Sequence, residues 1–408
     1  GGLLMNAVGI DVSKGKSMVA VMRPFGEVVA TPYEVSHTDA DLKTLVDFLK
    51  SLPGETKVVM EYTGKYYHPI AKILSEAGIF VSVVNALLIY RYGNNSIRKV
   101  KTDRLDAIKI ANYCLDRWVD LEPYTPLDQI RQTLKACHRQ YGQYMKLKVT
   151  LKNNLISLLG ETFPGINTLF KSAPRKEDGR EKWVDFVAKF WHRQCVCMSS
   201  YKSFAEKYQK WCSKAGYNFS EQNAKAIYDH ATAQVSTLPK TEATKSLITH
   251  AVNQLNTVAE TLSSIQQEML ELASKLPEFP VVMKMFGVGD ILGPQLMAEI
   301  GDIRRFERKQ SLIAFAGVDA PPCQSSTFES KNHHISKRGS PRLRKTLFQV
   351  MSTLLQHAPV DDPVFQFLDR KRQEGKHYYV YMTAGANKFL RIYYGTVKAY
   401  SEQSATQS

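Results

Sequence analysis

Short apolar runs that end at polar residues mark the beginning of the chain. Their length and their content of β-branched residues are typical of buried strands. The runs are residues 7–12, 18–22, 57–61 and 79–85. A polar turn at 13–17 joins the first two into a hairpin, and two helical patterns, at 41–50 and 66–77, lie between the later ones. Strands that alternate with helices in this way predict an α/β domain.

The middle of the chain has mainly helical periodicity. Residues 127–159 form a long amphipathic pattern with a basic polar side, suited to packing a partner helix or to following a nucleic-acid backbone. The basic residues are Arg139, Lys146, Lys148 and Lys152. Residues 164–238 are less regular, but their aromatic residues fall largely at helical spacing. This spacing favours a packed core over a stacking platform for bases.

A second long pattern resembles the seam of a coiled coil. Between residues 241 and 276 the apolar positions step by three and four residues. They are Leu247, Val252, Leu255, Val258, Leu262, Ile265, Met269, Leu272 and Leu276. Such a seam commonly joins protomers, so we expect a contact between subunits, with packing inside one chain as the alternative.

The last part of the chain predicts a turn, a loop and a basic helix. Two helical stretches flank Gly287 and Gly289, the pattern of a helix-hairpin-helix, in which glycines let the backbone approach a phosphate. An ordinary helix-helix turn is the alternative. Proline and serine make 321–327 a loop. A basic helix is then expected from Ser336, with Pro341 at an early helical position.

Four acids occupy positions that suit a metal site. Asp11 and Glu61 end apolar strands, and Asp103 and Asp106 are three residues apart at the start of a helical pattern, so they share one face. Acids at such places need cations, and carboxylates at this spacing suit Mg²⁺ in phosphoryl transfer. The alternative is that Asp11 caps a turn and Glu61 pairs with a lysine.

The charge balance points to a polyanionic partner. The 408-residue chain has 54 Lys and Arg against 39 Asp and Glu, a formal net charge of +15. Phosphate neutralisation supplies most non-specific affinity for nucleic acid, so DNA or RNA is the expected partner, and a basic protein without such a partner is the alternative. No apolar run has membrane-spanning length, so we expect no membrane association and a location in the cytoplasm.

The six cysteines are scattered, which favours free thiols over a disulfide framework. A zinc site that uses His192, Cys195, Cys197 and Cys212 is conceivable, although a Cys-x-Cys pair with one distant cysteine is poor ligand spacing.

Several blocks of the chain resemble one family. Gly9-Ile-Asp11-Val-Ser-Lys, Glu61-Tyr-Thr-Gly-Lys-Tyr-Tyr, Val84-Asn85 and Lys101-Thr-Asp103-Arg-Leu-Asp106-Ala are similar to conserved blocks of the insertion-sequence transposases that include the Piv and MooV DNA invertases. The resemblance implies a RuvC-like, ribonuclease H fold for the first domain. It also implies that Asp11, Glu61, Asp103 and Asp106 form an acidic tetrad that binds Mg²⁺ and takes part in catalysis.

The second half of the resemblance lies near the C-terminus. Ala314-Phe-Ala-Gly317, Pro321 to Ser326 and Ser336-Lys-Arg-Gly-Ser-Pro-Arg-Leu-Arg look like the family's second conserved region. There a loop serine attacks DNA, and the matching residue is Ser325. The family usually has glycine after this serine, whereas this chain has Ser326. A tetrad acid or metal-bound hydroxide is expected to take the serine proton, because no histidine lies beside Ser325.

The resemblance extends to partners and to domain organisation. It implies a recombinase that excises and inserts its element through 5′-phosphoserine links, guided by a structured bridge RNA that pairs with donor and target DNA. The resemblance also implies a dimer or tetramer and a location at the bacterial nucleoid. The expected domains are a RuvC-like domain with its following helix (5–160), a helical extension (161–238), a coiled-coil-like helix (239–280) and a mainly α serine transposase domain (281–408). Nucleic-acid contacts are expected at Lys101, Arg104, Gly287, Gly289, Lys337, Arg338, Arg342 and Arg344.

Other functions use the same features differently. A metal-dependent four-way-junction nuclease would use the four acids and water, with Ser325 incidental. A site-specific DNA invertase would keep the serine chemistry without a guide RNA. A non-catalytic nucleic-acid-binding protein would bind DNA without transferring strands.

Overall fold

The computed structural model describes residues 4–62, 66–84, 86–92, 102–319, 324–325, 328–329, 335, 337 and 339–406. The chain forms two compact units, Gly1–Gln129 and Ile130–Ser408. The boundary falls in the first turn of helix α5 (Pro126–Thr162), so nearly all of this helix belongs to the second unit. The four domain boundaries expected from the sequence stay predictions.

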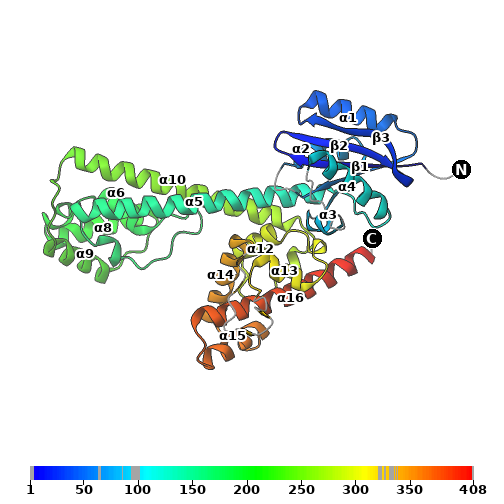
Figure 1. Cartoon of the computed structure of the whole chain (residues 1–408). Coiled ribbons are helices and arrows are strands. Elements are labelled where there is room, and N and C mark those ends of the chain that lie inside the picture. The colour runs from blue at the N-terminus through cyan, green and yellow to red at the C-terminus, as the bar shows by residue number, and fades with distance from the viewer. Residues whose placement is uncertain are drawn as a thin grey trace. The chain divides into compact units, whose positions relative to one another are not determined.

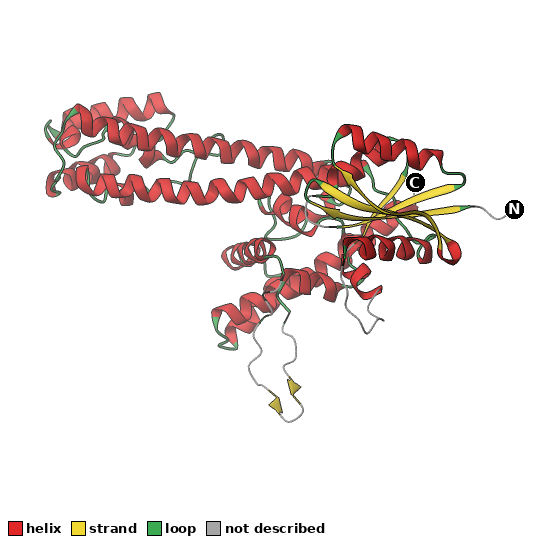
Figure 2. Ribbon diagram, turned by 45° about the horizontal axis from the view of Figure 1, so that its top comes forward, coloured by secondary structure: helices red, strands yellow, loops and turns green. Residues whose placement is uncertain are grey.

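A five-stranded mixed sheet forms the centre of the first unit (Figures 1 and 2). Its strands are β1 (Met5–Ser13), β2 (Lys16–Arg23), β3 (Glu27–Ser36), β4 (Glu55–Glu61) and β5 (Phe80–Val84). The spatial order is β3-β2-β1-β4-β5; the pairs among β1, β2 and β3 are antiparallel, and β4 runs parallel to both β1 and β5. This order and these directions are those of the ribonuclease H fold, so the predicted RuvC-like α/β class is confirmed.

Strand β3 was missing from the sequence-based expectation, which placed no strand between the hairpin and the next helix. The strand contains Pro32, and most of its residues are exposed or half-buried. Proline cannot donate to a strand ladder and is confined to edge strands and bulges. β3 is such an edge strand, and its pairing with β2 shifts register around Val21.

Helices cover both faces of this sheet. The helices are α1 (Asp39–Ser51), α2 (His68–Glu76), α3 (Ala86–Tyr92) and α4 (Asp103–Asp116). Val8 and Ile10 of β1 share a core with α1 and α2, whereas Ala7 shares a core with Ile110 of α4. Because successive residues of a strand point to opposite faces, the odd-numbered residues of β1 face α4. The unit therefore has three layers, with the sheet in the middle.

The second unit is helical. Its long helices α5 and α10 (Glu242–Ser274) lie side by side, and the shorter helices between them in sequence pack at one end of the pair (Figure 1). The shorter helices are α6 (Lys182–Lys189), α7 (Gln194–Cys197), α8 (Tyr201–Ala215) and α9 (Glu221–Ala233). Phe186, Phe204 and Tyr208 are fully buried there. The extension's aromatic residues are thus core, as their spacing favoured.

The expected coiled-coil seam is largely buried inside the chain. Val252, Leu255, Val258 and Leu262 of α10 are almost fully buried, and α10 shares hydrophobic cores with α5. Only Leu247, 49% exposed, clearly lies outside this packing. The expectation that the seam joins protomers is therefore corrected to its alternative, packing within one chain.

The C-terminal part of the second unit is mainly α, as expected. Its elements are α11 (Phe279–Val282), α12 (Leu292–Ile300), α13 (Lys309–Ala316), β6 (Gln324–Ser325), β7 (Phe328–Glu329), α14 (Pro341–His357), α15 (Pro363–Gln373) and α16 (Tyr378–Thr406). One hydrophobic core unites α12, α13, α14 and α16. Among the helices of the described residues, none combines the length and the apolar character needed to cross a membrane.

Helix α14 begins later than expected. Ser340 caps it by accepting a hydrogen bond from the Leu343 N–H at 3.1 Å, and Pro341 occupies its first position. Lys337 lies outside the helix in a left-handed conformation, with φ 51°. An α-helix cannot continue through that conformation, so the helix start at Ser336 was wrong.

Candidate functional site

The ends of two parallel strands bring Asp11 and Glu61 to one edge of the sheet. Ile10 of β1 pairs with Met60 of β4, and the two acids are the next residues along each strand. Alternation puts Asp11 on the same face as Ala7, and Glu61 on the same face as Val59. Both Ala7 and Val59 share a core with α4, so the two half-buried carboxylates lie on the α4 side of the sheet.

Gly9 lets α4 approach this face closely. A Cβ atom at Gly9 would stand 2.1 Å from the Ala107 carbonyl oxygen and 2.3 Å from the Ala111 nitrogen. Any larger residue would push the helix away. Glycine here therefore brings the first turn of α4, with Asp103 and Asp106, over the end of β1.

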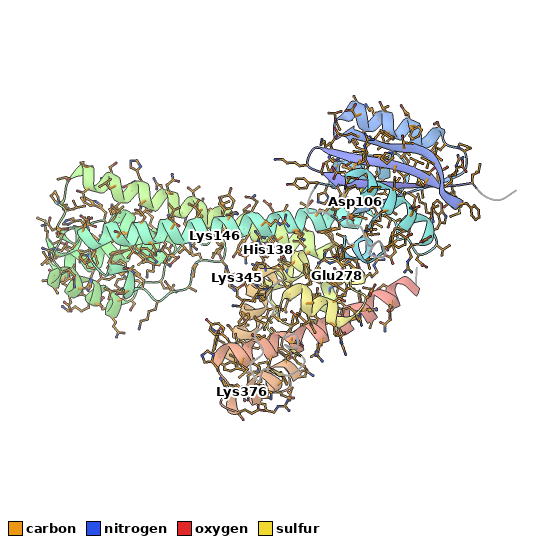
Figure 3. The ribbon with its side chains drawn as sticks, viewed as in Figure 1. Asp106, His138, Lys146, Glu278, Lys345 and Lys376 are labelled. Atoms are coloured by element: carbon orange, nitrogen blue, oxygen red, sulfur yellow. The ribbon has the colours of Figure 1, made fainter. Side chains whose placement is uncertain are left out.

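The first turn of α4 is fixed by a cap. The Thr102 hydroxyl accepts a hydrogen bond from the Leu105 N–H at 3.3 Å, and Asp103 and Asp106 follow in the first turn. Carboxylates are stabilised at this end by the unpaired N–H groups and the helix dipole. Asp103 is exposed and Asp106, labelled in Figure 3, is half-buried. The predicted helix with both acids on one face is confirmed.

Asp103 lies close enough to Lys16 of β2 for its charge to act on the lysine. Its ammonium donates to Glu34 at 2.7 Å, and this hydrogen bond and charge raise the pKa of Lys16. The negative charge of Asp103 raises that pKa further. Lys16 pairs with Ser13 at the end of β1. The first turn of α4 thus lies near the edge at which β1 ends.

The four acids have the chemistry of a divalent-cation site, because carboxylate oxygens are the ligands that such hard cations take. Three elements that contact one another carry them. In the part of the chain that the structure describes, no three His, Cys, Asp or Glu side chains stand close enough together to hold a metal ion. The fold thus brings into contact the elements that carry the four acids.

Ser325 lies on a very short hairpin in the segment between α13 and α14. β6 and β7 pair antiparallel, with Ser325 opposite Phe328 and Gln324 opposite Glu329. Ser325 is thus the last residue of β6. Ser326, together with the predicted contacts Lys101 and Arg338, lies outside the described residues.

The two ends of this segment meet at a narrow neck. A Cβ at Gly339 would lie 2.0 Å from the Phe315 carbonyl oxygen, and one at Gly317, where φ is +67°, would lie 2.9 Å from the Gly339 nitrogen. The Ser340 N–H donates to the Phe315 carbonyl at 2.7 Å, and Arg344 donates to the Ala316 carbonyl at 3.0 Å. The two ends of the segment that carries Ser325 are therefore in main-chain contact.

A buried polar cluster contacts Ser340 at this neck. Glu299 of α12, 4% exposed, accepts hydrogen bonds from the Ser340 hydroxyl at 2.9 Å and pairs with His138 Nδ1 of α5 at 3.0 Å. Burial opposes ionisation of Glu299, but the His138 and Ser340 hydrogen bonds outweigh it and lower the pKa of Glu299. His138, Glu299 and Ser340 are far apart in the sequence, and no local motif predicts that they meet.

The predicted nucleic-acid contacts differ in their surroundings. Arg104 and Arg342 are exposed in the first turns of α4 and α14, and Lys337 is exposed near the neck. Gly287, with φ +78°, packs against α14, since a Cβ there would lie 3.0 Å from the Val350 carbonyl oxygen. Space is open around Gly289. The glycine pair therefore has a packing role at Gly287, beside an α11 of only four residues.

The sequence also left a zinc site open. His192 Nε2 faces the Leu238 carbonyl at 3.1 Å, and its Nδ1 accepts from the Gln194 N–H at 3.1 Å. Both ring nitrogens are thus engaged by the main chain, and the described residues contain no metal-binding cluster around them.

Two family models match the chain. Residues 8–164 match a model described as a transposase, and residues 280–366 match one described as the transposase IS116/IS110/IS902 family. The first match contains the four acids, and the second contains Ser325, Glu299 and the neck.

Relatives and one solved structure are also similar. A protein of insertion element IS116 from Streptomyces clavuligerus is 22% identical over 371 residues, 90% of this chain and 88% of that protein. The transposase for insertion sequence element IS1111A from Coxiella burnetii is 32% identical over 98 residues, 24% of this chain and 27% of that protein.

Among solved structures, T. thermophilus RuvC in complex with a Holliday junction substrate is 12% identical, with 30% of this chain and 100% of that chain covered and a TM-score of 0.23. The fold assignment rests on the strand order of the sheet rather than on this likeness. Taken with the two family matches, the fold and the order of the motifs identify the chain as a member of the IS116/IS110/IS902 family of transposases, enzymes that cut and join DNA.

Proposed function

We propose that this transposase cuts and joins DNA through Ser325 as nucleophile, assisted by the acidic set Asp11, Glu61, Asp103 and Asp106. The observation that carries the proposal is the closed base of the serine segment, where Gly317 and Gly339 allow main-chain contact. Main-chain contact at the base of the segment supports a role in positioning a nucleophile, which must be held near the bond that it attacks.

The proposed step exchanges one phosphodiester for another. The Ser325 Oγ attacks the phosphorus of the scissile phosphate, the Oγ–P bond forms and the P–O3′ bond breaks. The DNA 5′ end stays on the serine, and the 3′ oxygen leaves as a hydroxyl after it takes up a proton. A carboxylate of the acidic set accepts the serine proton. Attack by a 3′-hydroxyl of the second DNA reverses these bond changes and frees Ser325.

We assign Mg²⁺ to the acidic set. Asp11, Glu61, Asp103 and Asp106 would hold it, and it would polarise the scissile phosphate and offset the charge that develops there. The chemistry of the donors supports this assignment, because carboxylate oxygens suit Mg²⁺ and the three elements that carry these acids contact one another.

A structured guide RNA and a homo-oligomer complete the proposed assembly. The net charge of +15 suits RNA as well as DNA, because both are polyanions. Ribonuclease treatment before the DNA is added distinguishes a guided recombinase, which loses site selection, from an RNA-independent invertase, which keeps it.

The experiment compares variants on nicked DNA that carries the ends of the element. Wild type should give a covalent protein–DNA product in Mg²⁺, and Ser325→Ala and Asp11→Asn should each abolish it. The matched controls are Ser264→Ala and Asp47→Asn, exposed positions on α10 and α1, which should leave the product unchanged. Cleaved DNA without covalent product would favour the water-dependent junction nuclease instead.

A further inference from the structure

A cavity of about 1130 Å³ lies among α14, α15 and α16 in the second unit. It is larger than most small-molecule pockets, which hold roughly 300–1,000 Å³. Val318 and Lys337, at the two ends of the segment that carries Ser325, belong to its lining. The cavity therefore begins beside the neck of the proposed nucleophile segment.

The charge of the lining has one sign. Four cationic side chains line the cavity and no carboxylate does; the cations are Lys337, Arg344, Lys388 and Arg391. Among the described residues, none of these four forms an ion pair with an acid. Arg344 donates to the Ala316 carbonyl at 3.0 Å, and Arg391 donates to the Asn387 side chain at 2.9 Å. A lining of this kind complements phosphate groups.

Aromatic rings supply the apolar part of the lining. Phe348, Phe367 and Tyr379 face the cavity, and the rings of Phe348 and Tyr379 lie 6.5 Å apart between centroids. Tyr379 is 65% exposed, so its ring is accessible to a stacking partner. Surfaces that combine cations with accessible aromatic rings bind single-stranded nucleic acid. Unpaired bases stack on the rings, and the phosphates of the backbone contact the cations.

We propose that this cavity, called the groove below and lined by Lys337, Arg344, Lys388, Arg391 and the three rings, holds unpaired nucleotides of a DNA strand. These nucleotides would lie next to the phosphate that Ser325 attacks. A paired base keeps its faces inside the duplex stack and cannot reach the rings, so the occupant is an unpaired strand. DNA rather than RNA is assigned because the groove adjoins the nucleophile segment. This inference rests on the proposed function of Ser325, although its binding step needs no chemistry.

The test measures binding to the full-length Ser325→Ala chain, so that covalent transfer does not contribute. Fluorescent oligo-dT, oligo-rU and a duplex serve as probes, and 2-aminopurine in oligo-dT reports stacking by loss of its fluorescence. Tyr379→Ala should weaken oligo-dT binding by roughly tenfold and restore 2-aminopurine fluorescence, whereas Tyr379→Phe should keep both. Lys388→Glu should weaken binding and flatten its dependence on salt.

Lys210→Glu on α8 is the charge-matched control, an exposed lysine away from the groove. The proposal is overturned if Lys210→Glu weakens oligo-dT as much as Lys388→Glu does. It is overturned equally if Tyr379→Ala leaves oligo-dT binding unchanged, or if the groove variants affect oligo-rU alone, which would assign the groove to RNA. Since Ser325→Ala removes the chemistry, failure of the serine mechanism leaves these outcomes readable.

Discussion

The Ala107 carbonyl oxygen lies where a side chain on Gly9 would have to be, 2.1 Å from an ideal Cβ atom. This contact sets the separation between α4 and β1 and hence between two acids on the helix and one on the strand. Position of the acidic set thus depends on a residue with no chemistry of its own.

Gly9→Ala should therefore damage both stability and activity. Main-chain atoms cannot rotate out of the way, so the helix must shift, and overpacking of this kind typically costs about 1–3 kcal/mol of unfolding free energy. Urea unfolding and the covalent-product assay measure the two effects. Gly142→Ala is the control, because its Cβ meets nothing within 4 Å in helix α5; it should be neutral or stabilising by about 0.5–1 kcal/mol. Equal behaviour of the two variants would contradict the close-approach argument.

Gly339→Ala should open the neck of the serine segment. Its Cβ would collide with the Phe315 carbonyl oxygen, which also accepts the Ser340 N–H. We expect loss of most covalent-product formation, at least tenfold, with a melting temperature that falls less than in a core variant such as Leu347→Ala. Gly395→Ala on α16, where space is open, should leave both measurements near wild type. Full activity in Gly339→Ala would show that the neck does not position Ser325.

Glu299→Gln should remove a pH-dependent part of the stability. The folded pKa of Glu299 lies below its unfolded value, so its contribution is present above the unfolded pKa, near 4.5, and is lost as pH falls through the folded pKa. At pH 7 the variant should lose about 1.5–3 kcal/mol, the worth of hydrogen bonds to a charged group. Urea unfolding at pH 7 and at successively lower pH should show the difference between wild type and variant shrinking. A constant difference across this range would contradict the assignment.

Glu278→Ala should destabilise the second unit strongly. Arg131 donates to both carboxylate oxygens of Glu278, and both side chains are nearly buried. Removing one partner of a buried pair leaves the other charge uncompensated, at a cost of about 3–5 kcal/mol. The exposed pair Lys225–Asp229 is the comparison: Asp229→Ala should cost about 0–1 kcal/mol. Thermal unfolding of the two variants gives the contrast, and similar losses would show that burial does not govern it.

Local pattern was enough to predict much of the first unit. Asp11 and Glu61 are found at strand ends because alternation and polarity are local signals, and the Thr102 cap agrees with the helix expected at Asp103. β3 was missed because Pro32 and its exposed residues weaken the strand pattern at an edge.

The positioning elements of the second unit have no local signal. His138, Glu299 and Ser340 meet only through tertiary packing of α5, α12 and α14. Gly317 and Gly339 likewise meet although they are far apart in the sequence, and neither glycine has a local pattern that predicts the contact. The cations of the groove come from separate parts of the chain, and they line one cavity only after α14, α15 and α16 pack together.

Peptide mapping of the covalent protein–DNA product decides whether Ser325 is the nucleophile. After protease and nuclease digestion, mass spectrometry should find one nucleotide attached through its 5′ phosphate to the hydroxyl of Ser325, with Asp11→Asn protein yielding none. Attachment at Ser326, or cleaved DNA with no attached peptide, would contradict the mechanism.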